Sequence, residues 1–359
     1  MPELGPFIHI DFTIAIQVVT LGFIGGVLSG FIGSGGAFFM TPGMMNLGVP
    51  GVIAVGTNIT HKFGKALMGS RKHGEMGNVD RKLGLFMLIT ALVGIRIAVW
   101  LNTTFFHLGG GEHGENSGSA AGDLYISCIF VAVLSIVSVF ILKDAIRTGK
   151  KEGGPSTKMA EFFSKIKIPP IITFKTADVQ ISFWIIAMVG LATGYLAGTI
   201  GVGGFIGVPA MIYIFGIPTT VAAGTELFLA MFMGAWGAIN YAWGGFVDLR
   251  LVLLLYLGSL TGIYIGAYGT KVVKEKIIRL VTGIIILLCV FSRAVNIPVY
   301  LHELQLLNLP GNWDASLNNI SKIFLFTSGI SGVIVILVSV FRAYRRRRKV
   351  QHLLRSVDS

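Results

Sequence analysis

Two stretches of the chain decide its fold: residues 29–57, SGFIGSGGAFFMTPGMMNLGVPGVIAVGT, and residues 197–225, AGTIGVGGFIGVPAMIYIFGIPTTVAAGT. The four glycines Gly30, Gly33, Gly35 and Gly36, the Gly-x-Pro group and the Ala-x-Gly-Thr group of the first stretch recur in the second at one offset (198 − 30 = 168). The same offset relates three downstream pairs, Gly77 and Gly245, Val79 and Val247, and Asp80 and Asp248. Chance does not supply so many matches at one spacing, so the sequence predicts two copies of one structural unit.

The composition of the chain is that of a membrane protein. Of its 359 residues, 53% are hydrophobic and only 13% are charged, whereas soluble domains carry about 25% charged residues. Lipid accepts such an apolar surface and water does not. The 48 glycines follow no collagen-like period, and they suit the close packing and the breaks of membrane helices. The predicted fold class is an all-α polytopic membrane protein, and the predicted location is the plasma or inner membrane of the cell.

The candidate spans are apolar runs of about 20 residues. They lie at 12–31, 50–70, 82–101, 124–147, 180–200, 218–243, 249–270, 277–296 and 320–341. Two shorter apolar pieces, 36–47 and 204–215, each follow a glycine cluster. At about 1.5 Å per residue neither piece is long enough to cross the bilayer, so both are predicted to be half-helices or re-entrant segments.

The charges of the loops predict the orientation of the spans. Lysine and arginine are concentrated in the 148–180 linker and in the 71–82 and 270–276 turns, which places these segments in the cytoplasm. The 102–123 loop has acidic residues but no Lys or Arg and is therefore outside, as is 297–319. The 71–82 turn is then inside, and its counterpart at 243–250 is outside. The two copies are predicted to be inverted repeats, with a substrate site near the midplane where the two glycine breaks meet.

The predicted domain organisation follows from these assignments. Its parts are a first membrane repeat at 12–147 with an outer loop at 102–123, a cytoplasmic linker at 148–179, a second membrane repeat at 180–296, an outer loop at 297–319, an additional transmembrane helix at 320–341 and a basic cytoplasmic tail at 342–359. The tail is interpreted as an anchor beside anionic lipid, not as a nucleic-acid patch, although the net charge is +12. No signal peptide, disulfide framework or metal-binding spacing is recognised.

The glycine breaks are the first candidate site. Glycine permits a positive φ and a close approach of the backbone to a ligand, and successive N–H groups at the start of a half-helix bind anions. The residues assigned to the breaks are Gly33, Ser34, Gly35 and Gly36 in the first copy and Gly201, Gly203 and Gly204 in the second. Thr57 and Thr225 are nearby hydroxyl donors that could equally bond to their own helices. Packing of helices on small residues is the alternative interpretation of the glycines.

A basic stripe in the 50–70 helix is the second candidate site. At 100° per residue, Thr57, Asn58, His61, Lys62 and Lys65 fall within an arc of about 140°. A lysine at mid-bilayer costs roughly 2.5–3.5 kcal/mol, which a bound anion would compensate. The alternatives are that the lysines extend to an interface and that His61 is buried and hydrogen-bonded. The second copy has Glu226 in place of Asn58, and this acid could pair with a lysine or carry a proton.

The paired Gly-x-Gly-Gly-x(4–5)-Pro segments, each followed by Gly-x-Pro and Ala-x-Gly-Thr, resemble the sulfite exporter TauE/SafE family of anion transporters. The resemblance covers residues 12–296. The resemblance implies transport of sulfite, sulfonates or related sulfur anions. The family includes both exporters and uptake permeases. The 102–123 insertion, the extra span at 320–341 and the basic stripe depart from the family pattern and bear on the substrate.

The function expected is therefore transport of a small sulfur-containing anion, by export through alternating access. Proton-coupled uptake is the alternative, and an anion channel or an intramembrane enzyme fits less well. Nucleotide-binding and nucleophile-elbow motifs are incomplete around Ser34, so no enzyme activity, cofactor, catalytic residue or metal ligand is assigned. The expected partners are the anion, membrane lipid and protons as a coupling ion; no nucleic-acid partner is expected, and the oligomeric state is left open.

Overall fold

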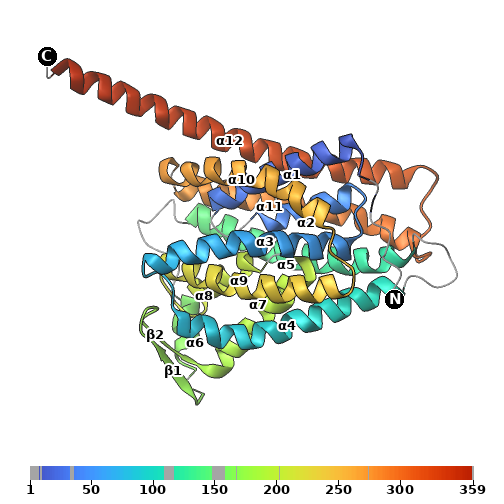
Figure 1. The fold of residues 1–359 in the computed structure, drawn as a ribbon, viewed down its shortest axis with the longest axis horizontal. Helices are drawn as coiled ribbons and strands as arrows, with labels where there is room; N and C mark the ends of the chain where they lie inside the picture. Colours follow the sequence, from blue (N-terminus) through green and yellow to red (C-terminus); the bar gives the residue numbers. More distant parts are fainter. Residues whose placement is uncertain are drawn as a thin grey trace.

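The computed structural model describes residues 8, 10–32, 36–108, 117–147, 158–166, 168–201, 203–273 and 275–357. Within these ranges the chain is a bundle of roughly antiparallel helices with one small β-hairpin at its edge (Figure 1). The elements are α1 (Phe12–Ile32), α2 (Ala37–Asn46), α3 (Gly51–Glu75), α4 (Arg81–Leu108), α5 (Ser117–Arg147), α6 (Lys158–Ser164), β1 (Ile171–Phe174), β2 (Val179–Ser182), α7 (Phe183–Ile200), α8 (Gly204–Tyr213), α9 (Thr219–Trp243), α10 (Leu249–Val272), α11 (Glu275–Glu303) and α12 (Trp313–Val357). The all-α polytopic fold class is confirmed.

Eight of the described helices are long and apolar enough to cross a membrane: α1, α4, α5, α7, α9, α10, α11 and α12. The helix predicted at 50–70 exists as α3 but is not among these eight, because Lys62, Lys65 and further polar residues lower its hydropathy. Helix α3 packs mainly against α9, and its first nine residues are buried. It is therefore an interior helix that brings polar side chains into the bundle.

The two short elements predicted after the glycine clusters are present as α2 and α8. Each has 10 residues, or about 15 Å of helix, which is half of the hydrocarbon thickness. All residues of α2 are buried, so its polar backbone ends lie within protein. Each half-helix carries an internal proline, Pro42 or Pro209, at nearly equivalent positions of the two copies.

Glycines pack α1 tightly against α10. Gly22, Gly26 and Gly30 repeat every fourth residue on α1, so they share one face of the helix. A methyl group added at Gly26 would stand 2.5 Å from the carbonyl oxygen of Ser259, and one added at Gly22 would stand 2.6 Å from that of Leu255. The corresponding pair, α7 and α4, packs in the same way. In a membrane such close backbone contact replaces the hydrophobic drive for helix association.

The linker between the two copies contains structure that the sequence analysis did not anticipate. Strands β1 and β2 form an antiparallel hairpin in which Ile171 faces Ser182 and Phe174 faces Val179. The hairpin is tied to the start of α4: Asp80 Oδ2 accepts a hydrogen bond from the Ala177 amide at 3.0 Å. The linker was interpreted from its lysines, which indicate a cytoplasmic position but say nothing of local pairing.

Several helices are longer than the predicted spans. Helix α11 continues to Glu303, and α12 is one helix of 45 residues that covers parts of the predicted outer loop, span and tail. Helices α4 and α5 likewise include residues assigned to the 102–123 loop, of which 109–116 lie outside the described residues. Helical hydrogen bonds are local and do not stop where hydropathy falls, so hydropathy marks a span but not the end of its helix.

Candidate functional site

A cavity of about 340 Å³ lies among α1, α2, α3, α8, α9 and α10. Helix α3 supplies most of its polar lining. The polar side chains that line it are Ser29, Asn58, His61, Lys62, Lys65, His73 and Glu226. The sequence analysis chose Asn58, His61, Lys62, Lys65 and Glu226 from two distant segments, and the fold brings them to one cavity. Gly204, the first residue of α8, also lines it.

Lys62 lies at the second glycine break. A methyl group built on Gly203 would stand 3.1 Å from Lys62 Nζ, so the ammonium group rests beside the N-cap of α8. The N-terminus of a helix carries a partial positive charge. Two positive groups therefore meet at this point, and neither Lys62 nor Lys65 has a hydrogen bond or an ion pair among the described residues. Glu226 is the acidic residue whose charge acts on Lys62, and positive groups gathered in this way attract an anion.

Asn58 connects three elements around the cavity. Its Nδ2 donates to the Ala37 carbonyl at 3.0 Å and to Thr41 Oγ1 at 2.8 Å, and the Thr41 hydroxyl donates to the Ile200 carbonyl at 3.1 Å. Helix α3 thereby holds the start of α2 against the end of α7. Residues next to both glycine breaks, Ala37 and Ile200, are thereby joined by one chain of hydrogen bonds.

His61 and Glu226 complete the lining. His61 is fully buried, its Nε2 lies 2.8 Å from Ser259 Oγ, and its ring centroid lies 4.5 Å from that of Tyr256. Glu226 is 2% exposed, and neither carboxylate oxygen has a hydrogen-bond partner in the described part of the chain. Its carboxylate lies against α8, where the carboxyl carbon would be 2.8 Å from a methyl group on Gly207.

The hydroxyls of Thr57 and Thr225 point away from the cavity and bond to turns of the opposite copy. The Asp248 amide donates to Thr57 Oγ1 at 3.2 Å, and the Asp80 amide donates to Thr225 Oγ1 at 3.0 Å. We call these two equivalent contacts the turn braces. Neither threonine lines the cavity.

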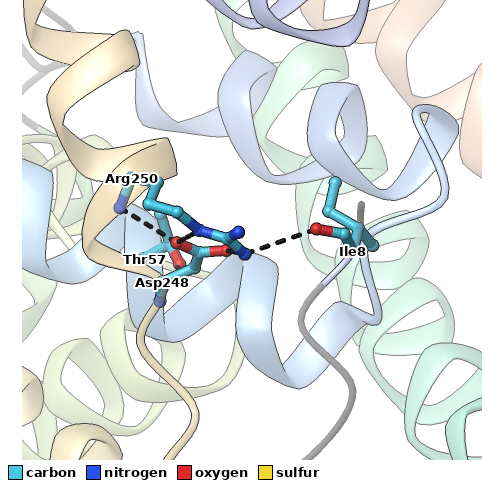
Figure 2. Close-up of polar contacts among 4 residues, drawn as sticks. All are labelled: Ile8, Thr57, Asp248 and Arg250. Carbon is cyan, nitrogen blue, oxygen red and sulfur yellow. Dashed lines mark hydrogen bonds and ion pairs between the residues drawn. The ribbon is translucent and has the colours of Figure 1, made fainter. Parts of the chain in front are cut away.

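Figure 2 shows the Thr57 brace together with its surroundings. Asp248 caps α10 by accepting from the Arg250 amide at 2.9 Å, and it forms an ion pair of 2.8 Å with the Arg250 guanidinium. Arg250 also donates to the Ile8 carbonyl at 3.3 Å, which ties the segment before α1 to the turn. The equivalent basic residue of the first copy, Lys82, donates to the Thr173 carbonyl of the hairpin at 3.0 Å.

The glycines of the breaks differ from one another. Gly201 has φ +76° and ends α7 in the left-handed conformation, as expected for such a break. Gly36 has φ −71° and Gly203 has φ −64°, so the expectation of a positive φ is wrong at these two residues. Gly36 instead packs against the backbone of Gly25 on α1, which leaves no room for a side chain. Gly33, Ser34 and Gly35 lie outside the described residues, and their role stays a prediction.

Two buried charged residues were missed by the sequence analysis. Asp123 was assigned to an outer loop, but it lies on α5 and its Oδ1 accepts a hydrogen bond of 2.5 Å from the Gly51 amide at the start of α3. Arg293 on α11 is fully buried and donates to Asn46, to Tyr300 Oη at 3.1 Å and to Ser321 Oγ at 3.3 Å. The available signal for Arg293 was its position deep in the apolar run 277–296, far from Arg279 near the start of that run.

We expect Thr225→Val to lower the thermal stability of the protein while leaving anion affinity nearly unchanged. The substitution leaves the Asp80 amide without its acceptor, which costs about 1–3 kcal/mol for a buried group. Thermal unfolding in detergent and anion titration of the same preparation measure the two effects. Thr220→Val, at an exposed position of the same helix, is the control. An affinity loss of about tenfold with unchanged stability would contradict the bracing role and return Thr225 to the binding site.

The fold and the cavity define a class of protein, a multi-pass membrane transporter with a polar site inside its helical bundle. Residues 18–292 match the family model "Sulfite exporter TauE/SafE", so the chain belongs to this family. It is 27% identical over 269 residues to "Probable membrane transporter protein YdhB" of Bacillus subtilis, covering 73% of this chain and 93% of that protein. It is 24% identical over 277 residues to "Probable membrane transporter protein YjnA" of the same organism, covering 76% and 97%. No solved structure matches the chain.

Proposed function

We propose that the protein moves a small sulfur-containing oxyanion, such as sulfite or a sulfonate, across the membrane by alternating access, and that the cavity is its binding site. The observation that carries the proposal is the pair of ammonium groups, Lys62 and Lys65, that line the cavity without a hydrogen bond or ion pair among the described residues. Each costs roughly 2.5–3.5 kcal/mol at membrane depth. A bound anion offsets that cost, and the N-terminus of α8 adds to the attraction.

The inverted-repeat arrangement is part of this proposal. Its support is the equivalent pair of turn braces, Thr57 with Asp248 and Thr225 with Asp80. In addition, the equivalent residues Arg250 and Lys82 each donate to a backbone carbonyl in the segment before the first helix of the opposite copy. Inverted repeats with a broken helix in each half are a recurrent transporter design, in which one half moves against the other around a central site.

Export is the direction that needs no coupling. With the cell interior negative, outward movement of one negative charge gains about 2.3 kcal/mol per 100 mV. Proton-coupled uptake is the second candidate, and one observation favours it: Glu226 is a buried carboxylate within the cavity that could take up and release a proton.

Flux of labelled sulfite, sulfate and sulfonates in proteoliposomes tests the proposal. We expect saturable flux of sulfite or a sulfonate, driven by voltage alone for export. Inward flux that requires a pH gradient and is lost in Glu226→Gln would establish the uptake candidate instead. Single-channel currents, or no flux of any of these anions, would refute alternating-access transport of a sulfur anion.

The orientation proposed for the two copies is tested by cysteine labelling. In a background lacking Cys128 and Cys289, we expect Met76→Cys and Lys165→Cys to react only from the cytoplasmic side. Gly244→Cys, at the turn equivalent to Met76, and Asn312→Cys should react only from the outer side. All four positions are exposed. Labelling of positions 76 and 244 from the same side would show that the copies are not inverted.

A further inference from the structure

The cavity contains hydrogen-bond acceptors as well as positive charges. Asn58 Oδ1 and both carboxylate oxygens of Glu226 are buried and have no hydrogen-bond partner in the described ranges. Both residues line the cavity. Buried polar groups are nearly always hydrogen-bonded, so unpaired acceptors beside a cavity point to a donor on its ligand. A simple anion that offers only oxygen atoms would leave these acceptors unpaired.

The orientation of the Asn58 amide is set by its neighbours. Its Nδ2 donates to the Ala37 carbonyl at 3.0 Å, and a carbonyl oxygen can only accept. Rotating the amide by 180° would place Oδ1 against that carbonyl, where two acceptors face each other. It would also remove the hydrogen bond that Nδ2 donates to Thr41 Oγ1. Oδ1 is therefore the atom left over for a ligand, and it presents an acceptor.

Glu226 is positioned by packing against α8 and by electrostatic attraction to Lys62, without a hydrogen bond in the described ranges. Its carboxylate lies over Gly207 of α8, where any larger side chain would collide with it. An ionised carboxylate accepts hydrogen bonds and donates none. A negatively charged oxygen of a ligand would be repelled by this carboxylate. An O–H group of the ligand would instead donate a hydrogen bond to the carboxylate.

The charges of the cavity balance a single negative charge. At formal charges, with histidines counted as neutral, Lys62 and Lys65 contribute two positive charges and Glu226 contributes one negative charge. One net positive charge remains, which a monoanion neutralises. A dianion would leave an excess negative charge at membrane depth, where an uncompensated charge is costly.

We infer that the ligand of this cavity is a singly charged oxyanion that also carries a hydrogen-bond donor, and that the cavity discriminates against fully ionised dianions. Hydrogen sulfite and hydroxyalkanesulfonates have this chemistry, and sulfate does not. The anionic oxygens face Lys62, Lys65 and the N-terminus of α8, and the donor faces Glu226 and Asn58 Oδ1. The inference rests on the proposed function and specifies the substrate class of that site.

Two sulfonates of equal charge and nearly equal size test the donor requirement. They are 2-hydroxyethanesulfonate and 1-propanesulfonate, which differ by a hydroxyl in place of a methyl group and stay singly ionised at neutral pH. We expect the parent protein to bind the hydroxyl-bearing anion roughly ten- to a hundredfold more tightly by calorimetric titration, because the methyl group leaves the carboxylate unpaired. In Glu226→Leu the ratio should fall below about threefold, since the charged acceptor is gone and only the neutral, weaker acceptor Asn58 Oδ1 remains.

Sulfate tests the charge requirement. We expect Glu226→Gln, which removes the negative charge and keeps the shape, to bind sulfate at least about tenfold more tightly than the parent does. Glu75→Gln, at an exposed acid at the end of α3, is the matched control and should change neither result. Thermal unfolding of each variant verifies that it is folded.

The possible results separate this inference from the proposed function. Equal affinity of the parent for the two sulfonates, or a preference that is undiminished in Glu226→Leu, overturns the donor requirement alone. Sulfate binding that is as tight as hydroxyethanesulfonate binding in the parent overturns the charge requirement. If the parent binds neither sulfonate nor sulfite, the proposed function itself is overturned.

Discussion

Replacing Lys62 by alanine is expected to weaken anion binding ten- to a hundredfold. In the proposed site the Lys62 ammonium, beside the N-cap of α8, makes one charge-assisted contact with the anion, and loss of such a contact costs about 1.5–3 kcal/mol. Membrane insertion should not suffer, because a costly charge is removed from a membrane-embedded helix. Anion titration of the purified variant measures the affinity, and its yield from the membrane measures insertion.

The controls for Lys62→Ala distinguish binding from charge in general. Lys165→Ala removes an exposed lysine of the linker and should leave affinity unchanged. Lys62→Arg keeps the charge, but a planar guanidinium differs in shape from a compact ammonium, so we expect only partial recovery. If Lys62→Ala and Lys65→Ala both bind the anion as tightly as the parent, the basic stripe is not a binding site.

Replacing Gly203 by valine is expected to abolish transport in a protein that still inserts. A methyl group at this position would stand 2.8 Å from Ala197 Cβ and 3.1 Å from Lys62 Nζ, so the larger side chain must push the ammonium group out of place. Displacing a positioned charge by about 1 Å can reduce the rate of a chemical step about a hundredfold, and we expect a comparable loss of flux. Flux in proteoliposomes, normalised to inserted protein, is the measurement.

Gly74→Val is the matched control for Gly203→Val. Gly74 lies near the end of α3, and nothing stands within 4 Å of a methyl group built there. Flux should be close to that of the parent. If Gly203→Val also transports normally, the glycine serves packing only and the second break is not part of the binding site.

Much of the architecture could be predicted because the relevant signals are local in the sequence. The repeated glycine–proline pattern predicted α2 and α8, and the positions 58, 61, 62 and 65 fell on one face of a helix by arithmetic alone. The meeting of that face with Glu226 in one cavity could be guessed only from the duplication. The assignment of these residues to a substrate stays a proposal.

The features that escaped prediction depend on partners far apart in the chain. Asp123 accepts a hydrogen bond from the Gly51 amide, and Arg293 donates one to Asn46. No local sequence pattern predicts either pair. The conformation of Gly36 was also mistaken, because a glycine required by close packing looks the same in a sequence as one required by a positive φ. Only the position of α1 relative to α2 separates the two explanations.

The turn braces have a consequence for the reversibility of transport. Each is a hydrogen bond from an aspartate amide to a threonine hydroxyl, 3.2 Å long in one copy and 3.0 Å in the other. In the proposed alternating-access cycle, the two braces would cost similar free energies to break, because they are bonds of one kind. The braces themselves therefore favour neither of the two proposed open states. The concentration gradient of the anion and the membrane voltage would then determine whether the protein exports the anion or takes it up.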